Sequence, residues 1–238
     1  MKIVKYINSK TFIHNIHIDG RVGSIKDEED CINLLKQSDD FIVLDENDKI
    51  VKDKICIIVP KIREWYDIEV LYNNRHYYIN IKSSTLKTYD NVGCVAVLMF
   101  GLFGKRKILS NKTKSEQYAE LFFEYNKHDK NGYDDVSNID YYFLVINKNK
   151  SNGCFITSLN HMNKKSIQSN GSNLPFQCNW GRNSSKILLD KSKICDMIIR
   201  TVFESLVKSI DIFEQEPIKI YMSNHNINRN IPNISSLW

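Results

Sequence analysis

The pattern of apolar and polar positions divides the first half of the chain into short strands and amphipathic helices. Residues 24–38 begin with Ser24 and an acidic first turn and continue with apolar side chains at helical spacing, which predicts a helix. Residues 41–45 (FIVLD) and 54–60 (KICIIVP) are short apolar runs typical of strands. The apolar positions of residues 113–127 fall on one side of a helix, so a second helix is expected there.

The second half of the chain continues this mixture. We expect two strands at 140–147 and 153–159 joined by the polar KNKSN, the longest helix at 187–214, and a last strand at 218–222. The apolar run 92–103 fits a buried helix or a strand, because its two glycines leave both open, and residues 160–174 form a polar loop. Strands and helices without regular alternation predict an α/β (α+β-like) fold, in which helices flank a central mixed β-sheet. The length suits a single domain over residues 1–238.

Residues 65–84 (WYDIEVLYNNRHYYINIKSS) predict a β-hairpin around the Asn-Asn pair. A two-residue turn is favoured because Asn tolerates positive φ, and it places Asp67 opposite Asn80. A four-residue loop would keep the same parity and place Asp67 opposite Lys82. An odd loop length would instead send Lys82 to the other face of the hairpin.

With an even loop, one face of the hairpin is polar and the other is apolar. The polar face carries Asp67, Glu69, Asn80 and Lys82, and the apolar face carries Ile68, Val70, Ile79 and Ile81. Carboxylate oxygens suit Mg²⁺, which polarises a phosphate and activates water, and a nearby lysine offsets charge that develops in the transition state. The alternative interpretation is a half-buried hairpin with a solvated polar face.

The spacing D-x12-N-x-K resembles the active-site motif of the PD-(D/E)XK nuclease superfamily, particularly its type II restriction endonucleases. The resemblance implies a restriction-endonuclease-like fold, a metal-binding carboxylate at Asp67, a catalytic lysine at Lys82 and a metal-ligating carbonyl at Ile81. Asn80 stands where the family usually has an acid. Similar enzymes carry an N-I-K triplet followed by a Ser or Thr pair and a D-N element, here Ser83-Ser84 and Asp90-Asn91.

A neutral amide at position 80 leaves room for a compensating acid. Glu69 is the best placed candidate, two residues from Asp67, and we expect it to be both a catalytic residue and a metal ligand. Glu28 and Glu29 on the early helix are weaker candidates.

A second, looser similarity covers residues 174–183 (LPFQCNWGRN), which resemble a DNA-facing segment before the long C-terminal helix. Gln177 and Asn179 suit adenine and Arg182 suits guanine in the major groove. The alternative is a strand end with Trp180 in the core. Other DNA contacts are expected at Ser83, Ser84, Lys87 and Asn91, and the basic candidates for phosphate contacts include Lys105, Arg106, Lys107, Lys164 and Lys165.

Composition narrows the function classes only moderately. The net charge of +5 and pI near 8.7 permit nucleic-acid binding without demanding it. Six dispersed cysteines without a C-x-x-C pair argue against a zinc ribbon and indicate free thiols in a reducing cytoplasm. We expect no signal peptide and no membrane association, because the longest apolar run is too short to cross a bilayer. Phosphate-loop, dinucleotide-binding and nucleophile-elbow motifs are absent from the sequence.

The function expected is therefore a Mg²⁺-dependent type II restriction endonuclease that hydrolyses double-stranded DNA at a short sequence. Because such sequences are usually palindromic, a two-fold homodimer is expected. The enzyme is further expected to be paired functionally, without a stable complex, with a DNA methyltransferase that protects the host. The alternatives are a DNA-binding protein with a degenerate nuclease fold and a repair or mobile-element nuclease with little sequence preference.

Overall fold

The computed structural model describes residues 2–10, 20–45, 54–60, 64–106, 111–150, 152–172, 175–183, 189–211 and 223–224. Its α-helices are α1 (Lys2–Ser9), α2 (Gly20–Lys36), α3 (Val95–Phe103), α4 (Lys114–Asn131) and α5 (Lys191–Asp211), and two short 3₁₀ turns are η1 (Asp134–Val136) and η2 (Leu159–His161). Within these residues no helix is both long enough and apolar enough to span a bilayer.

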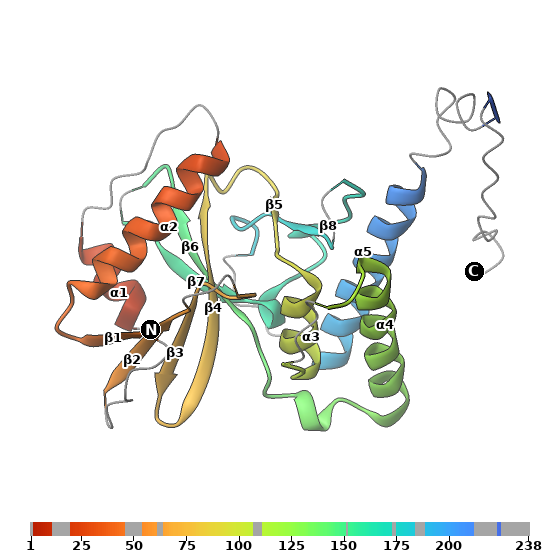
Figure 1. Ribbon diagram of the computed structural model, residues 1–238, viewed down its shortest axis with the longest axis horizontal. Coiled ribbons are helices and arrows are strands. Elements are labelled where there is room, and N and C mark those ends of the chain that lie inside the picture. Colours follow the sequence, from red (N-terminus) through yellow and green to blue (C-terminus); the bar gives the residue numbers. More distant parts are fainter. Residues whose placement is uncertain are drawn as a thin grey trace.

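A six-stranded mixed sheet forms the centre of the fold (Figure 1). Its strands are β1 (Phe41–Asp45), β2 (Ile55–Val59), β3 (Ile68–Tyr72), β4 (Arg75–Ser84), β6 (Tyr142–Asn147) and β7 (Phe155–Ser158), and their spatial order is the same. The pairs β1–β2 and β4–β6 are parallel, whereas β2–β3, β3–β4 and β6–β7 are antiparallel. The predicted mixed sheet with flanking helices is confirmed.

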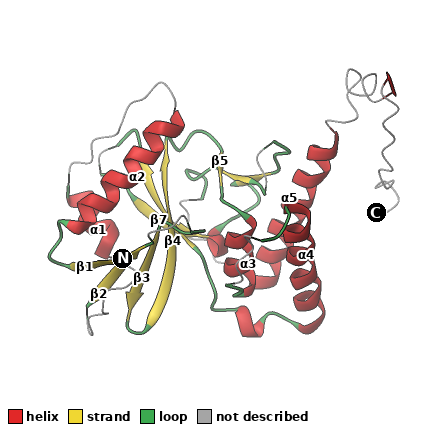
Figure 2. Cartoon of the chain, viewed as in Figure 1, coloured by secondary structure: helices red, strands yellow, loops and turns green. Residues whose placement is uncertain are grey.

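Helices cover both faces of this sheet (Figure 2). Ile79 and Ile81 of β4 pack with α1 and α2, while Tyr78 of the same strand packs with α3 on the opposite face. Strand β6 likewise sends alternate side chains into the two clusters, so it is apolar along most of its length, as a strand buried on both faces must be. Both faces of β4 therefore pack against helices, and neither face of this strand is a fully solvated polar surface.

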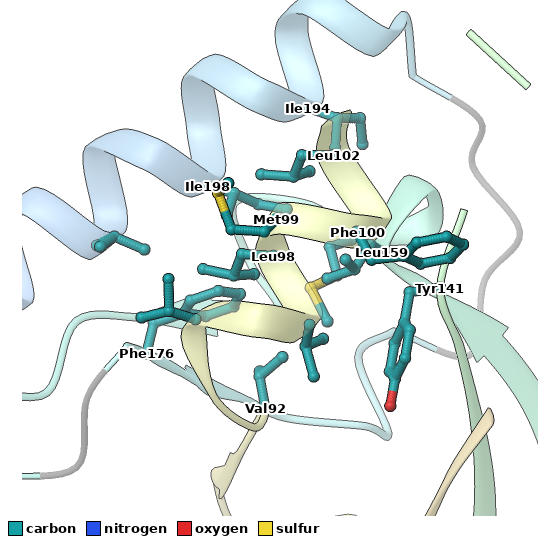
Figure 3. Packing of buried hydrophobic residues seen from close by; sticks show 14 of the residues in the cluster. Val92, Leu98, Met99, Phe100, Leu102, Tyr141, Leu159, Phe176, Ile194 and Ile198 are labelled. Carbon is teal, nitrogen blue, oxygen red and sulfur yellow. The ribbon is translucent and has the colours of Figure 1, made fainter. Parts of the chain in front are cut away.

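The larger core surrounds α3, which resolves the ambiguity of residues 92–103 in favour of a helix (Figure 3). Gly101 allows this helix to approach the sheet closely, because a Cβ there would lie 2.2 Å from a Leu159 methyl group and 2.8 Å from Tyr141 Cβ. Gly104 ends the helix in the left-handed conformation at φ 68°. Gly101 thus serves packing rather than a break in the helix.

The structure also contains a three-stranded sheet that was not predicted from the sequence. It joins β5 (Asp90–Asn91), β9 (Gln177–Cys178) and β8 (Ile167–Gln168) in the order β5-β9-β8, with both pairs antiparallel. Strand β8 and the end of turn η2 fall in the segment 160–174, so the prediction of a polar loop throughout this segment was wrong. Helix α1 was not predicted either, whereas the predicted strand at 218–222 lies outside the described residues.

Other predicted elements agree with the structure. Helices α2, α4 and α5 and strands β1, β2, β6 and β7 are present within a few residues of their predicted ends. All six cysteines are free thiols, of which only Cys94 is exposed.

Candidate functional site

The β3–β4 hairpin turns through Asn73 and Asn74, whose φ angles are 50° and 58°. Two consecutive left-handed residues define the two-residue turn that matches strand twist, and Tyr72 pairs with Arg75 across it. The register continues to Ile68 opposite Ile79, and the Asp67 amide donates to the Ile79 carbonyl at 3.0 Å. Asp67 therefore lies opposite Asn80, as the sequence predicted.

The left-handed conformation of the turn can be tested by mutation of Asn74. Replacing Asn74 with Ala should lower the free energy of unfolding by about 1 kcal/mol, because a side chain with a plain Cβ strains the left-handed conformation. Asn74→Gly is the matched control, and it should preserve or slightly raise stability. Urea unfolding of the three proteins measures the difference; equal midpoints for the Ala and Gly variants would contradict the turn geometry.

Asp67 lies just beyond the point where the strands separate. Pairing of β2 with β3 stops at Ile58 opposite Glu69, so the Asp67 side chain emerges at the open end of the sheet. Its Oδ2 accepts a hydrogen bond from the Ile81 amide at 2.6 Å. The N–H of Ile81 thus fixes the carboxylate of Asp67 relative to β4.

Glu28 of α2 meets this carboxylate from another element. A side-chain hydrogen bond joins Glu28 to Asp67, and Lys82 contributes a favourable charge. Burial, followed by the negative charge of Asp67, raises the pKa of Glu28 from 4.5 to about 7. The two carboxyl groups therefore share a proton near neutral pH, and a cation could take the place of that proton.

Lys82 lies in the same pocket and is partly buried. Desolvation lowers the pKa of its ammonium group, while the nearby charges of Asp67, Glu28 and Asp90 act in the opposite direction. Burial thus makes the Lys82 ammonium group lose its proton more easily than that of an exposed lysine. It also remains within reach of three carboxylates that favour its charged form.

The pocket that these residues share has a volume of about 700 Å³. It lies among α2, the end of β2, the beginning of β3, β4 and the start of α3. Its lining residues are Ile25, Glu28, Ile32, Val59, Pro60, Glu64, Trp65, Tyr66, Asp67, Asn80, Lys82, Gly93, Cys94 and Val97. Asn80 lines the pocket, and its Oδ1 is buried and has no hydrogen-bond partner among the described residues.

These oxygens suit a hard cation such as Mg²⁺. The described residues hold no group of three or more His, Cys, Asp or Glu side chains arranged around one metal position. However, Mg²⁺ retains water and commonly takes only one or two carboxylates from the protein, together with substrate phosphate oxygens. Asp67, Glu28 and the Asn80 amide oxygen supply such a set.

The structure does not bring Glu69 into this pocket. Its carboxylate contacts His76 Nδ1, and it lies opposite Tyr78 further along the hairpin. Glu28, the weaker candidate from sequence, occupies the position next to Asp67 instead. The sequence did contain a signal for Glu28. This residue lies at helical spacing from Cys31 and Leu35, which are buried, and so on the same side of the helix.

Ser83 and Ser84, at the end of β4, each hold an acidic side chain through a hydrogen bond. The Ser83 hydroxyl donates to the buried carboxylate of Asp27, and the Ser84 hydroxyl donates to Asp90 Oδ2 at 2.6 Å. Burial raises the pKa of Asp90, and the Ser84 hydrogen bond and the charge of Lys82 partly oppose that rise. The Ser84 hydroxyl thus orients an acid whose charge acts on Lys82, whereas the Ser83 hydroxyl ties α2 to β4.

The remaining predicted DNA contacts separate into buried and exposed groups. Asn179 is buried, where its amide donates to the Lys87 carbonyl at 3.2 Å, and Trp180 is fully buried in the core. Arg182 is exposed, donates to the Tyr89 hydroxyl at 2.8 Å and lies over the Tyr89 ring. Lys87 is exposed too.

Asn91 and Gln177 meet on the small sheet, where Gln177 Nε2 donates to Asn91 Oδ1 at 3.2 Å. Gln168, which the sequence interpretation missed, completes this group. Of the basic candidates, Arg106 lies over the Tyr78 ring, and Lys107 falls outside the described residues.

Comparisons with known proteins add no assignment. A scan against protein-family models finds no match to the chain, and a search of the curated proteins finds none either.

Proposed function

We propose that this protein is a Mg²⁺-dependent endonuclease that hydrolyses double-stranded DNA at a short specific sequence, as a type II restriction endonuclease does. The observation that carries the proposal is the convergence of Asp67, Glu28 and Lys82 in one pocket at the open end of the sheet. Two acids, an amine and an amide in one pocket form a set that supports metal-assisted phosphodiester hydrolysis.

Each residue has a definite task in this proposal. Asp67 and Glu28, with the Asn80 amide oxygen, would hold Mg²⁺, which when bound polarises the phosphate and makes water more acidic. The Ile81 amide keeps Asp67 in its orientation. Lys82, whose pKa is lowered by burial, orients the attacking water and balances the negative charge that develops on the phosphate.

Symmetry extends the proposal to the assembly and its biological setting. A palindromic sequence presents the same bonds on both strands, so a two-fold homodimer with one pocket per subunit would cut both. Such an enzyme requires a DNA methyltransferase that protects the host at the same sequence, without a stable complex between the two proteins.

A second candidate is a DNA-binding protein that has lost catalysis. It is favoured by Asn80 in place of an acid and by the lack of a three-acid metal group among the described residues. This candidate keeps the same DNA surface and differs only in its chemistry.

Incubation of the purified protein with plasmid DNA and Mg²⁺ tests the proposal. Discrete fragments that disappear when the metal is chelated are expected. A smear would indicate a nuclease with little sequence preference, and intact DNA together with retained binding in a gel-shift assay would favour the second candidate. Intact DNA without binding would contradict both.

A further inference from the structure

Three side-chain amides form a continuous chain across the small sheet. Gln168 Nε2 donates to Gln177 Oε1 at 3.2 Å, and Gln177 Nε2 donates to Asn91 Oδ1 at 3.2 Å. The register explains the contacts, because Asn91 and Gln168 each pair directly with Gln177 from the two neighbouring strands. We call these three residues the amide ladder.

The ladder leaves one hydrogen-bond donor and one acceptor position of the Gln177 amide available for a ligand. A primary amide has two N–H donors and two lone pairs, and the ladder uses one of each. The remaining N–H and the remaining lone pair make no other hydrogen bond to the described part of the chain. One donor beside one acceptor is complementary to adenine in the major groove, where N7 accepts and the N6 amine donates.

The exposure of the ladder favours a role in binding over one in stability. Asn91 and Gln168 are exposed and Gln177 is partly exposed. Exposed hydrogen bonds contribute little net stability, and holding a glutamine in one rotamer opposes folding through lost entropy. Side chains fixed before binding, however, lose less entropy when a ligand arrives.

The location of the ladder connects it with the pocket. Asn91 directly follows Asp90, whose carboxylate accepts from Ser84 and whose charge acts on Lys82. Neighbouring strands are about 4.8 Å apart, so three strands span about 10 Å, close to the length of three base-pair steps of about 3.4 Å each. Figure 1 shows β5 and β8 between the large sheet and α5.

We propose that the amide ladder reads adenine in the major groove, with Gln177 making the paired hydrogen bonds and with Asn91 and Gln168 holding its amide plane. The inference rests on the proposed function and adds the kind of sequence that is recognised. The recognised sequence contains an A·T pair within a few base pairs of the bond that is cut.

Selection of bound duplexes from a random DNA library, without Mg²⁺ so that cleavage plays no part, tests this inference. Wild-type protein should enrich a motif that contains an A·T pair. Gln177→Leu should lose about 10- to 100-fold of its discrimination at that one position. Gln177→Glu should shift the preference there from adenine toward cytosine, because a carboxylate accepts from the cytosine N4 amine.

Gln37→Leu is the matched control, since Gln37 is an exposed glutamine just after α2 and outside the small sheet. It should enrich the wild-type motif, and thermal melting should verify that all variants are folded. A wild-type motif without A·T pairs, or one unchanged by both Gln177 substitutions, would overturn the ladder assignment while leaving the proposed function intact. Failure of the wild-type protein to bind DNA would overturn the proposed function itself.

Discussion

Lys82→Ala should lower the rate of DNA cleavage by about 10²- to 10³-fold or more, the usual cost of removing a group that stabilises transition-state charge. Lys82 lies beside Asp67 and Glu28, and burial lowers the pKa of its amine. In the proposed mechanism its removal would delete both the group that orients water and a positive charge beside the phosphate. Single-turnover cleavage with saturating protein measures the chemical step directly.

Two further variants separate chemistry from folding. Lys82→Met keeps the apolar stem, so it should remain folded and inactive, with a lower melting temperature than the wild type because Asp67 and Glu28 lose their compensating positive charge. Lys130→Ala, at an exposed lysine in the last turn of α4, should cut at a rate within a few-fold of the wild type. Cleavage by Lys82→Ala at the wild-type rate would refute the assigned role.

The hairpin shows how far local sequence reaches. The Asn-Asn pair fixed the turn, and strand alternation then placed Asp67 opposite Asn80 without any tertiary information. The same parity placed Glu69 on the Asp67 face, which is correct as register. Strand alternation does not reveal where the neighbouring strand β2 ends. Glu69 is still paired with β2, whereas Asp67 lies beyond the end of that pairing and therefore in the pocket.

The sequence did not predict the contacts between elements that lie far apart along the chain. The choice between Glu28 and Glu29 depends on how α2 rotates against the sheet, which is set by packing of Cys31 and Leu35 in the core. The small sheet was missed because two-residue strands are too short to show a period. The pairing of β5 with β9 matches Asp90 with Cys178 and Asn91 with Gln177, far apart in the chain and beyond any local signal.

Glu28→Gln should abolish most cleavage and at the same time stabilise the protein above neutral pH. The pKa of Glu28 rises from 4.5 to about 7 in the folded state, so the folded protein favours the protonated form. This preference contributes stability that is fully present below about pH 4.5 and is lost as pH rises through about 7. Glutamine resembles the protonated acid and can still donate to Asp67, so it avoids that loss.

Thermal melting across this pH range measures the effect. Wild type and Glu28→Gln should melt at similar temperatures near pH about 4, and the variant should melt higher by a few degrees at pH about 8. Mg²⁺ should then raise the melting temperature of the wild type at the higher pH and do so less for the variant, because a cation that binds only the folded state stabilises it.

Glu29→Gln is the matched control for both readouts. Glu29 is the exposed neighbour on the same helix, so its substitution should leave cleavage, the pH dependence of melting and the Mg²⁺ response close to those of the wild type. Opposite behaviour of the two variants would assign the second acid to Glu29. If instead both behave as the wild type, then α2 supplies no acid to the site, and the pair of carboxylates that makes the pocket suitable for a cation would have to be sought elsewhere.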